Sequence, residues 1–564
     1  MEGQCPFYRD HRRPAIDLYS VSIDASSQSD WLFMFADLLR GGEQFVGQSY
    51  ENKGADNEEG KPASRSRSDK TWETFTVQDA LETFGFGKFQ LKLCILTGLA
   101  WTGEAVEMVI LSILGPQLHC EWRLPTYEVA LIALMLFVGM IIGSPLWGNV
   151  FDKLGRRVGL ISSMCWTLFY GLLSAFAPAY TWVLLLRGLV GFGIAGCSQS
   201  VTLYSEFLPI KMKGPRIMIM KVFWSFGTVM EVLLAIWIMP RLGWRWLLGV
   251  SVLPKAIFVC FSFWLPESPH FDLMAGNTEK VMLTLQRVAK ENGQTMLQGK
   301  VIPQIENNRG QIKDLFAPQY WRATLLLWFI WFAAAFSYYG LILLTTELFQ
   351  SGDPCGRTQR TEDEHVCFLE CQYLTLTDYK DLLWTTLAEF PGVLFFLLMV
   401  DRIGRKISLA LCFFMFSLFI LPLHACVGRV VLTIFIFIAR AFIAGGFQLV
   451  FVYTPQVFPI KNRALAVGTC NAVGRAGSLV TPFVSEVMLR KSFNLTLSAY
   501  FVCSLLAGIA CLMLPNKTLS AALQESKLDN EDGVQTNLCS ASLEVIGTLG
   551  RPPAGLDDGF LHDD

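Results

Sequence analysis

Two acidic residues lie where acids are rare, inside a long and mostly apolar stretch. Glu104 and Glu107 interrupt residues 89–114. Their spacing of three places them on one face of a helix. Neighbouring carboxylates in an apolar setting favour the sharing of a proton, which suits reversible proton uptake. We therefore predict proton coupling or cation binding at this pair. The alternative is a structural pair, bonded to polar groups of adjacent helices.

Three further charged residues interrupt apolar stretches, namely Glu231, Glu389 and Arg475. A charge inside a membrane costs about 2.5–3.5 kcal/mol on insertion scales, and such residues tend to mark solute pathways. Pro391 predicts a local break of the helix that carries Glu389, with carbonyl groups left free. Arg475 is suited to bind an anionic group or to neutralise one of the acids. A structural role is an equal alternative for each of the three.

Aromatic and basic residues complete the candidate set. Trp224, Tyr338 and Tyr339 have faces on which a flat or cationic solute stacks, although packing or interface anchoring is the alternative for each. Arg187 and Arg440 are predicted near the inner third of their helices, with a gating or pairing role. Lys255 has no partner that the sequence identifies.

The elements that carry these residues are predicted to be membrane-spanning helices. Of 564 residues, 52% are hydrophobic and only 17% are charged, against roughly 25% charged in average proteins. A soluble body of this size would lack polar surface. Each apolar stretch holds about the 20 residues that a helix needs to cross a bilayer. We count twelve of them, at 89–114, 127–147, 158–178, 181–202, 217–239, 244–265, 323–345, 380–400, 407–426, 430–452, 464–488 and 495–514.

The remaining segments divide the chain into five parts. Lys and Arg favour loops 148–157, 209–216, 266–322, 401–406 and 461–463, which predicts that these loops and both termini are cytosolic. Residues 276–292 have the pattern of a short amphipathic helix. The expected parts are a cytosolic and largely disordered tail (1–88), a six-helix bundle (89–265), a cytosolic central loop (266–322), a second six-helix bundle (323–514) and a cytosolic tail (515–564).

A charged motif occurs once in each half. Residues 148–157 read Gly-Asn-Val-Phe-Asp-Lys-Leu-Gly-Arg-Arg, and residues 401–406 read Asp-Arg-Ile-Gly-Arg-Lys. The segments 204–209 and 453–459 repeat a second pattern, in which Glu206 corresponds to Gln456. Parallel repeats of this kind are typical of secondary transporters built from two bundles. We predict that the motif steadies one end state of two rocking bundles. The alternative, a solvated loop, would explain the arginines but not the glycines Gly148 and Gly155 at their positions in the motif.

The chain resembles the major facilitator superfamily. The resemblance rests on the repeated loop motif, on Arg187-x-x-x-Gly191 and on Pro266-Glu267-Ser268. Within the superfamily it is most similar to the synaptic vesicle two-related proteins, over roughly residues 75–515. Four stretches carry that likeness: 84–114, 327–331, 336–340 and 453–463. The resemblance implies an all-α fold of twelve helices in two pseudo-symmetric six-helix bundles. It also implies gating roles for Asp152, Arg156, Arg157, Arg187, Glu206, Glu267, Asp401, Arg405 and Arg440.

Two covalent modifications are predicted on the side opposite the central loop. Cys120, Cys355, Cys367 and Cys371 form two disulfides in one of three pairings if that side is oxidising; reduced thiols are the alternative. Asn494-Leu495-Thr496 is a glycosylation sequon, but it adjoins the membrane.

The sequence contains no phosphate-binding G-x-x-x-x-G-K-[ST] motif and no His/Cys cluster with metal-site spacing. Gly191-x-Gly193-x-x-Gly196 lies inside an apolar stretch and predicts close helix packing. We therefore expect no enzyme, cofactor, metal or nucleic-acid partner. The expected function is proton-coupled or other secondary transport of a small organic solute, with Glu104, Glu107, Trp224, Glu231, Tyr338, Tyr339, Glu389 and Arg475 at the central site. A vesicle membrane is the expected location by resemblance, with the plasma membrane second. The alternative is a transporter-shaped vesicle receptor with unknown protein partners.

Overall fold

The structure is a computed structural model that describes residues 74–302, 311–350, 373–425, 427–458 and 460–514. All of these residues belong to one compact unit. Most of both predicted tails lies outside the described residues, as do Cys355, Cys367 and Cys371 and the side chain of Asp401.

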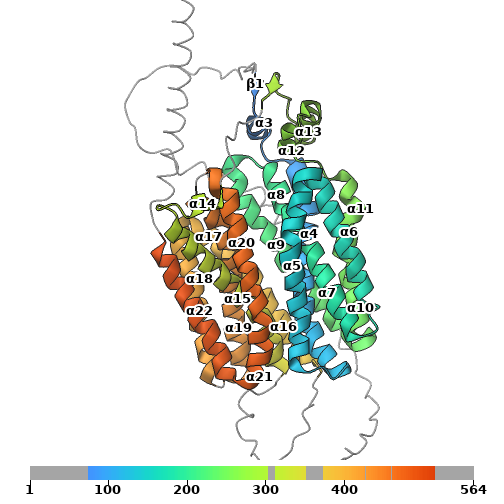
Figure 1. The fold of residues 1–564 in the computed structure, drawn as a ribbon, viewed down its shortest axis with the longest axis vertical. Coiled ribbons are helices and arrows are strands. Elements are labelled where there is room, and N and C mark those ends of the chain that lie inside the picture. The colour runs from blue at the N-terminus through green and yellow to red at the C-terminus, as the bar shows by residue number, and fades with distance from the viewer. Residues whose placement is uncertain (1–73, 303–310, 351–372, 426, 459, 515–564) are drawn as a thin grey trace, which may run out of the picture. The chain divides into compact units, whose positions relative to one another are not determined.

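The first half of the described chain forms one helical bundle, shown in blue and green in Figure 1. Its helices begin and end close to the predicted stretches, but two stretches are each divided. The fourth is interrupted at residues 195–198, just after Gly193. The sixth is interrupted at Val252, because Pro254 lies in the first turn of the following helix and has no backbone N–H to donate. The elements are α4 (Lys88–Glu121), α5 (Thr126–Leu154), α6 (Arg156–Ser174), α7 (Tyr180–Ile194), α8 (Gln199–Glu206), α9 (Ile210–Leu242), α10 (Trp244–Ser251), α11 (Leu253–Phe261) and the 3₁₀ turn η1 (Ser262–Trp264).

The second half forms the other bundle, shown in yellow to red. Its eighth stretch is interrupted at Ala388, three residues before Pro391, as the sequence predicts, since the proline cannot donate to the carbonyl four residues earlier. The elements are α15 (Trp321–Gln350), α16 (Leu376–Leu387), α17 (Glu389–Ile403), α18 (Arg405–Ile420), η3 (Leu421–Ala425), α19 (Arg429–Val457), α20 (Ile460–Pro482), the π-helix η4 (Phe483–Met488), α21 (Leu489–Lys491) and α22 (Phe493–Met513).

Within the described ranges, ten helical segments are long and apolar enough to cross a membrane. The third and eleventh predicted stretches are represented by α6 and α20, which fall outside that set. They occupy the expected places: α6 packs against α7, and α20 packs along α15. The all-α membrane fold of two bundles is thus confirmed.

Close helix contacts hold the first bundle together. A Cβ atom on Gly191 of α7 would lie 2.0 Å from the carbonyl oxygen of Leu136 in α5, and one on Gly139 of α5 would lie 2.0 Å from that of Gly188. Only glycine allows the two backbones to approach so closely. The predicted packing role of the glycines in this stretch is confirmed.

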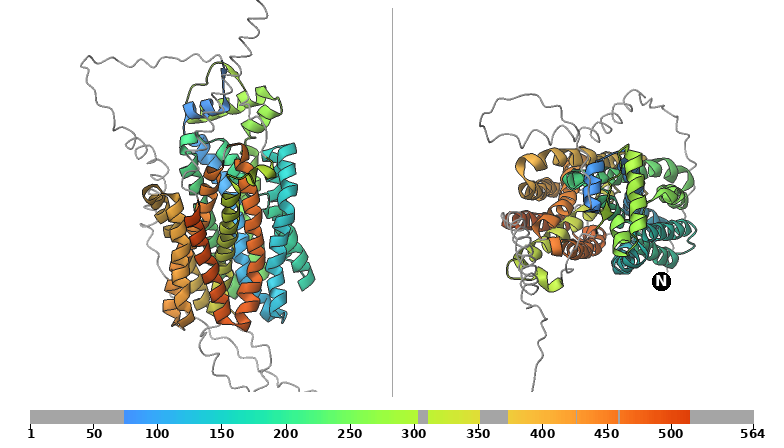
Figure 2. Two further views of the ribbon diagram at one scale, coloured as in Figure 1. Left: turned by 60° about the vertical axis from the view of Figure 1, so that its left-hand side comes forward. Right: turned by 90° about the horizontal axis from the view of Figure 1, so that it is seen from above.

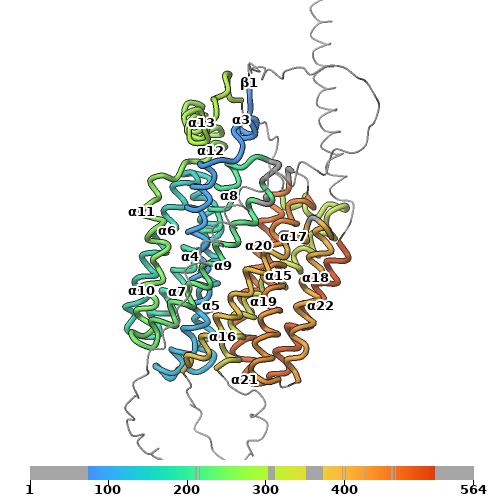
Figure 3. The backbone as a smooth tube through the Cα atoms, turned by 180° about the vertical axis from the view of Figure 1, so that it is seen from behind, coloured from blue at the N-terminus to red at the C-terminus, as the bar shows by residue number. Residues whose placement is uncertain are grey.

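The two bundles lie side by side (Figures 2 and 3). Helices α4 and α5 of the first bundle contact α15 and α20 of the second, and α9 contacts both α16 and α17. We call this boundary the seam.

A small cap covers the end of the first bundle. It joins the strand β1 (Thr74–Phe75), paired in parallel with β2 (Lys300–Val301), to helices α3 (Val77–Phe84), α12 (Pro269–Met274) and α13 (Thr278–Asn292). The short helix α14 (Ile312–Leu315) follows. The amphipathic helix predicted over 276–292 is confirmed as α13, with Val281, Leu285 and Val288 buried and Leu283 exposed.

The assignment of residues 74–87 to the disordered tail is wrong. Thr76 and Asp79 form a capping box at the start of α3, and the hydrogen bonds from Thr76 lower the pKa of Asp79. The helix buries Val77, Leu81 and Phe84. Its packing partner is α13, about 200 residues later in the chain, so local sequence gives no indication of it.

Candidate functional site

Glu104 contributes an ion pair across the seam. Its carboxylate lies 3.5 Å from Nη2 of Arg475 in α20, and Nη1 of the same arginine lies 3.2 Å from Sδ of Met140 in α5. The Glu104 side chain is almost fully buried. Of the two roles predicted for Arg475, the structure shows the neutralisation of an acid.

Glu107 lies in a separate ion cluster inside the first bundle. It accepts hydrogen bonds from Nη1 of Arg187 at 2.7 Å and from Nζ of Lys255, and all three side chains are buried. Ser251 donates to both carboxylate oxygens of Glu231, at 2.9 and 2.8 Å. We call Glu107, Arg187, Glu231 and Lys255 the first-bundle cluster. Lys255 thus has the partner that the sequence does not reveal.

Glu104 and Glu107 have different partners, and proton coupling at these acids stays a prediction. Glu107 pairs with two cations of the first bundle, whereas Glu104 pairs with one cation of the second. Residues three apart on an α-helix differ in direction by about 60°, and α4 is buried on every side in this region. The two side chains therefore reach different neighbours.

Glu389 is the centre of a hydrogen-bonded network that crosses the seam. It accepts from Nε and Nη2 of Arg440, both at 3.2 Å, and from the hydroxyl of Tyr338 at 3.0 Å. From the other bundle, Ser225 donates to the same carboxylate at 3.2 Å, and Nε1 of Trp224 donates to the Tyr338 hydroxyl at 2.6 Å. A charge buried this deeply is stable only with such partners.

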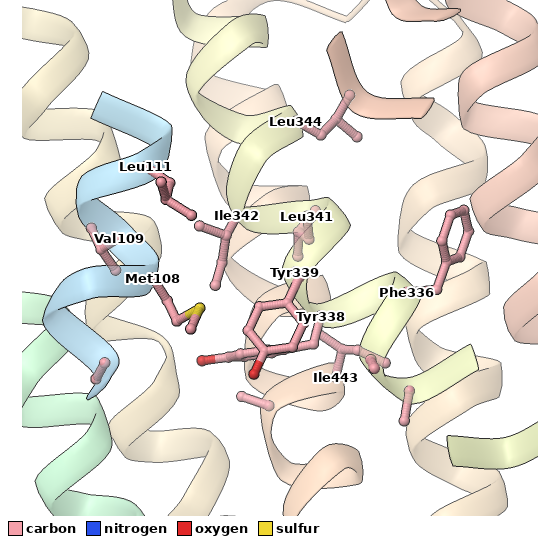
Figure 4. Packing of buried hydrophobic residues seen from close by; sticks show 14 of the residues in the cluster. Met108, Val109, Leu111, Phe336, Tyr338, Tyr339, Leu341, Ile342, Leu344 and Ile443 are labelled. Atoms are coloured by element: carbon pink, nitrogen blue, oxygen red, sulfur yellow. The ribbon is translucent and has the colours of Figure 1, made fainter. Parts of the chain in front are cut away.

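The three predicted aromatic residues pack against other rings. Trp224 packs against Trp101 with ring centroids 5.5 Å apart, and Tyr338 stacks on Phe447, also at 5.5 Å. Tyr339 packs on Phe137 of the first bundle at 5.5 Å. Figure 4 shows Tyr338 and Tyr339 on α15 below a group of apolar side chains, in which Met108 and Leu111 of α4 point toward Ile342 of α15. These aromatic residues hold the bundles together at mid-span.

Sequence analysis missed Lys221 of α9. Its side chain is 2% exposed, and Nζ lies 4.5 Å from the ring centroid of Trp224 and 4.8 Å from that of Tyr338. Its position inside the fifth apolar stretch, three residues before Trp224, was a sufficient signal to include it.

The first loop motif makes its described contacts within the first half of the protein. Oε1 of Glu267 accepts from the backbone N–H groups of Arg156 and Arg157 at 2.7 and 3.1 Å, at the start of α6. Burial raises the pKa of Glu267, although these N–H groups oppose the shift. The Arg156 side chain lies 3.4 Å from Asp152 and 3.8 Å from Glu206.

The repeat of the motif is visible in the backbone. Gly155 and Gly404 each begin a helix with nearly the same left-handed conformation, φ 95° and φ 89°. Arg405 follows Gly404 as the first residue of α18, just as Arg156 follows Gly155. The placed glycines of the motif therefore serve the same tight turn in both halves.

The predicted position of Arg187 and Arg440 near the inner third of their helices is wrong. Arg187 is the middle residue of α7 and lies in the first half of the segment that α7 and α8 form together. Arg440 lies in the first half of α19, so both are nearer to the end away from the central loop. Their side chains form the buried ion pairs with Glu107 and Glu389. The sequence places a residue along a helix only as accurately as it places the helix ends.

A further polar cluster, also missed by sequence analysis, joins the bundles at the end away from the central loop. Arg490 lies 3.3 Å from Glu347 of α15 and 3.3 Å from Nε2 of His119 in α4. Glu486 is buried close by in the π-helix. Cys120 is disulfide-bonded, to a partner outside the described residues. Asn494 of the sequon lies in the first turn of α22.

Two helical bundles that pack side by side along a seam with buried ion pairs define a membrane protein of the major facilitator fold. The solved structures of the xylose transporter XylE from E. coli share this fold. The partially occluded inward-open form matches with a TM-score of 0.59 and 15% identity, over 76% of this chain and 98% of that one. Residues 49–354 match the family of sugar and other transporters, and residues 382–548 match the major facilitator superfamily.

The chain belongs to the synaptic vesicle 2-related family of the major facilitator superfamily. It is 57% identical to the synaptic vesicle 2-related protein of Xenopus laevis, over 83% of this chain and 86% of that protein. It is 43% identical to the putative transporter svop-1 of Caenorhabditis elegans, over 85% of this chain and 92% of that protein. It is 35% identical to the human putative transporter SVOPL, over 80% and 94%.

Proposed function

We propose that the protein is a secondary active transporter that moves a small organic solute by alternating access. The observation that carries this proposal is the buried network around Glu389, which draws on both bundles. Buried charges at mid-membrane are costly and tend to mark solute and ion pathways. Four direct hydrogen bonds to one carboxylate, three from the second bundle and one from the first, make a site that changes when the bundles tilt.

The distribution of contacts along the seam supports rocking of the bundles. Polar contacts between the bundles occur at mid-span, at Glu104–Arg475, and at the far end, at His119–Arg490, while α9 also contacts α17 toward the central-loop end. The described contacts of the first loop motif stay inside one half. The bundles are therefore free to separate at the central-loop end without breaking the bonds of that motif.

Glu104 is the favoured acid for proton exchange. Its pairing with Arg475 is long, at 3.5 Å, and its buried Oε2 has no hydrogen-bond partner among the described residues. Glu107, in contrast, is held by two cations at close range. The ionised carboxylate of Glu107 balances the charge of one of these two cations. Glu231 is then the acid of the same cluster that can exchange a proton. We infer proton coupling through Glu104, with Glu231 as the second candidate.

The membrane location and the orientation are part of the same proposal. The relatives that carry the name synaptic vesicle 2-related protein support a vesicle membrane over the plasma membrane. The excess of Lys and Arg in the central loop and in the motif loops supports cytosolic termini.

The proposal is tested by solute-driven proton flux. The full chain is reconstituted in liposomes that contain a pH-sensitive dye, and sugars, amino acids, organic amines and organic carboxylates are added in turn. At least one compound is expected to drive a pH change in wild type, and Glu104→Gln is expected to abolish that change while solute counterflow persists. If no compound gives flux or counterflow, the protein is not a transporter, and the receptor hypothesis takes its place.

A second test addresses the loop motif. Asp152 is half exposed and lies 3.4 Å from Arg156. Asp152→Asn is expected to slow transport severalfold, because one end state loses a stabilising charge, and to leave solute binding unchanged. The neighbouring Lys153→Gln serves as the control for a loop charge outside the described pairs. An unchanged rate in Asp152→Asn would contradict a role for the motif in alternation.

A further inference from the structure

The charges at the seam do not balance. We call Glu104, Lys221, Glu389, Arg440 and Arg475 the seam cluster. It contains three cations and two acids, all of them buried or nearly buried. A surplus positive charge in a low-dielectric interior is costly unless an anion accompanies it.

Lys221 is the cation without an acid. Arg440 pairs with Glu389 and Arg475 with Glu104. Among the described residues, the ammonium group of Lys221 has no ion pair, and it lies over the faces of Trp224 and Tyr338. Contact with aromatic faces stabilises a buried cation less than an ion pair with a carboxylate does. Glu389, Arg440 and Glu104 are the charged groups that act on it electrostatically.

A second donor in the seam cluster is also unsatisfied. Nη1 of Arg440 is buried and has no hydrogen-bond partner among the described residues, although Nε and Nη2 both bind Glu389. A buried guanidinium donor without a partner has lost its bond to water and gained none in return, so it destabilises the fold. A carboxylate or similar oxyanion satisfies this kind of donor best.

The apolar surroundings suit the rest of a small organic molecule. Trp224 and Tyr338 present ring faces to Lys221, and Phe447 stacks on the ring of Tyr338. A small cavity lies at the seam, and one of its lining residues, Met218, precedes Lys221 by three residues in α9. It is lined by Met218, Val393, Phe396, Gly445, Gln448 and Leu449.

We propose that the seam cluster binds a singly charged organic anion, with its carboxylate held by Lys221 and Arg440 and its apolar part against Trp224, Tyr338 and Phe447. This inference rests on the proposed transport function, because it names the class of the solute. One negative charge cancels the surplus of the cluster and supplies acceptors to both unsatisfied cations. Cationic solutes are disfavoured because they would add a second uncompensated charge.

Binding is measured by thermal unfolding of the full chain in detergent. The probes are three matched sets with the same apolar groups: benzoate, phenylacetate and hexanoate; benzylamine, phenethylamine and hexylamine; and the corresponding alcohols. We expect at least one carboxylate to raise the unfolding temperature in a concentration-dependent way, and its amine and alcohol counterparts to do so only at concentrations at least tenfold higher.

Lys221→Met removes the charge and keeps the length of the side chain. It is expected to raise the half-maximal carboxylate concentration at least tenfold, whereas Lys221→Arg retains binding within severalfold. Lys92→Met is the control. It removes an exposed lysine that pairs with Glu291 of the cap, and it is expected to leave the carboxylate effect unchanged. If Lys221→Met does not fold, Lys221→Gln takes its place in the comparison.

Three results overturn the proposal: no carboxylate stabilises wild type, amines stabilise it more than carboxylates, or Lys221→Met binds carboxylates as wild type does. Failure of the anion proposal is distinguishable from failure of transport. Proton flux or counterflow with an amine or a neutral solute would support the transport proposal and contradict the anion proposal. Carboxylate binding that depends on Lys221, without flux or counterflow of any solute, would support the anion proposal and contradict the transport proposal.

Discussion

Individual charged residues contribute to this protein in clusters. Glu107 separates two buried cations, Arg187 and Lys255, which would otherwise repel each other in an apolar bundle. Removal of one member of such a cluster leaves an uncompensated charge, whereas removal of a balanced pair leaves a packing change only.

A stability measurement tests this account of Glu107. Glu107→Gln is expected to lower the free energy of unfolding by about 3–5 kcal/mol, because two buried cations lose their counter-charge. The double variant Glu107→Gln/Lys255→Met leaves one cation instead of two, and it is expected to unfold at a higher temperature than Glu107→Gln alone. Thermal unfolding in detergent gives the comparison. A double variant less stable than the single one would contradict the ion-cluster account.

At the scale of elements, glycine determines how closely helices approach. Helices α5 and α7 meet with backbone against backbone at Gly139 and Gly191. This contact fixes the angle of α7, which carries Arg187 toward Glu107 on α4. The geometry of the first-bundle cluster therefore depends on residues that have no side chain.

Gly191→Ala tests this dependence. The new Cβ would lie 2.0 Å from a backbone oxygen, which cannot move without displacing α5. We expect a loss of about 1–3 kcal/mol of stability or more from overpacking. Gly148→Ala in α5 is the matched control, since nothing lies within 4 Å of its added Cβ and alanine favours the helix. Equal unfolding temperatures for the two variants would mean that the helices separate at little cost.

At the scale of the whole molecule, the protein is two bundles in contact along a seam, part of which lies between mid-span and the end away from the central loop. Apolar contacts between α4 and α15 accompany the polar ones there (Figure 4). Alternating access requires that this contact opens while the other end closes.

A cross-link between the bundles tests the movement. Leu111 and Ile342 are buried on facing helices and point toward each other. The variant Leu111→Cys/Ile342→Cys is expected to form a disulfide on oxidation and to lose transport, because α4 and α15 can no longer separate. Each single variant, oxidised in the same way, controls for the native cysteines. Full transport by the oxidised double variant would rule out opening at this contact.

The sequence by itself determined the class of the protein and most of its elements. Apolar stretches long enough to cross a bilayer leave few alternatives to helices, since every backbone polar group must be satisfied within the segment. Local signals were also sufficient for the break before Pro391, for the amphipathic helix α13 and for the glycine turns at Gly155 and Gly404. Each of these depends on residues close together in the chain.

Only the tertiary structure decided which charges meet. Glu104 and Glu107 look like a pair on one helix, but α20 supplies the partner of the first and α7 and α11 supply the partners of the second. Likewise, the capping box of α3 is local, whereas its packing partner α13 is remote. The physical reason is that an ion pair forms between groups a few ångströms apart in space, whatever their separation in the sequence. A linear pattern fixes the direction of a side chain on its own helix, but not the helix that it faces.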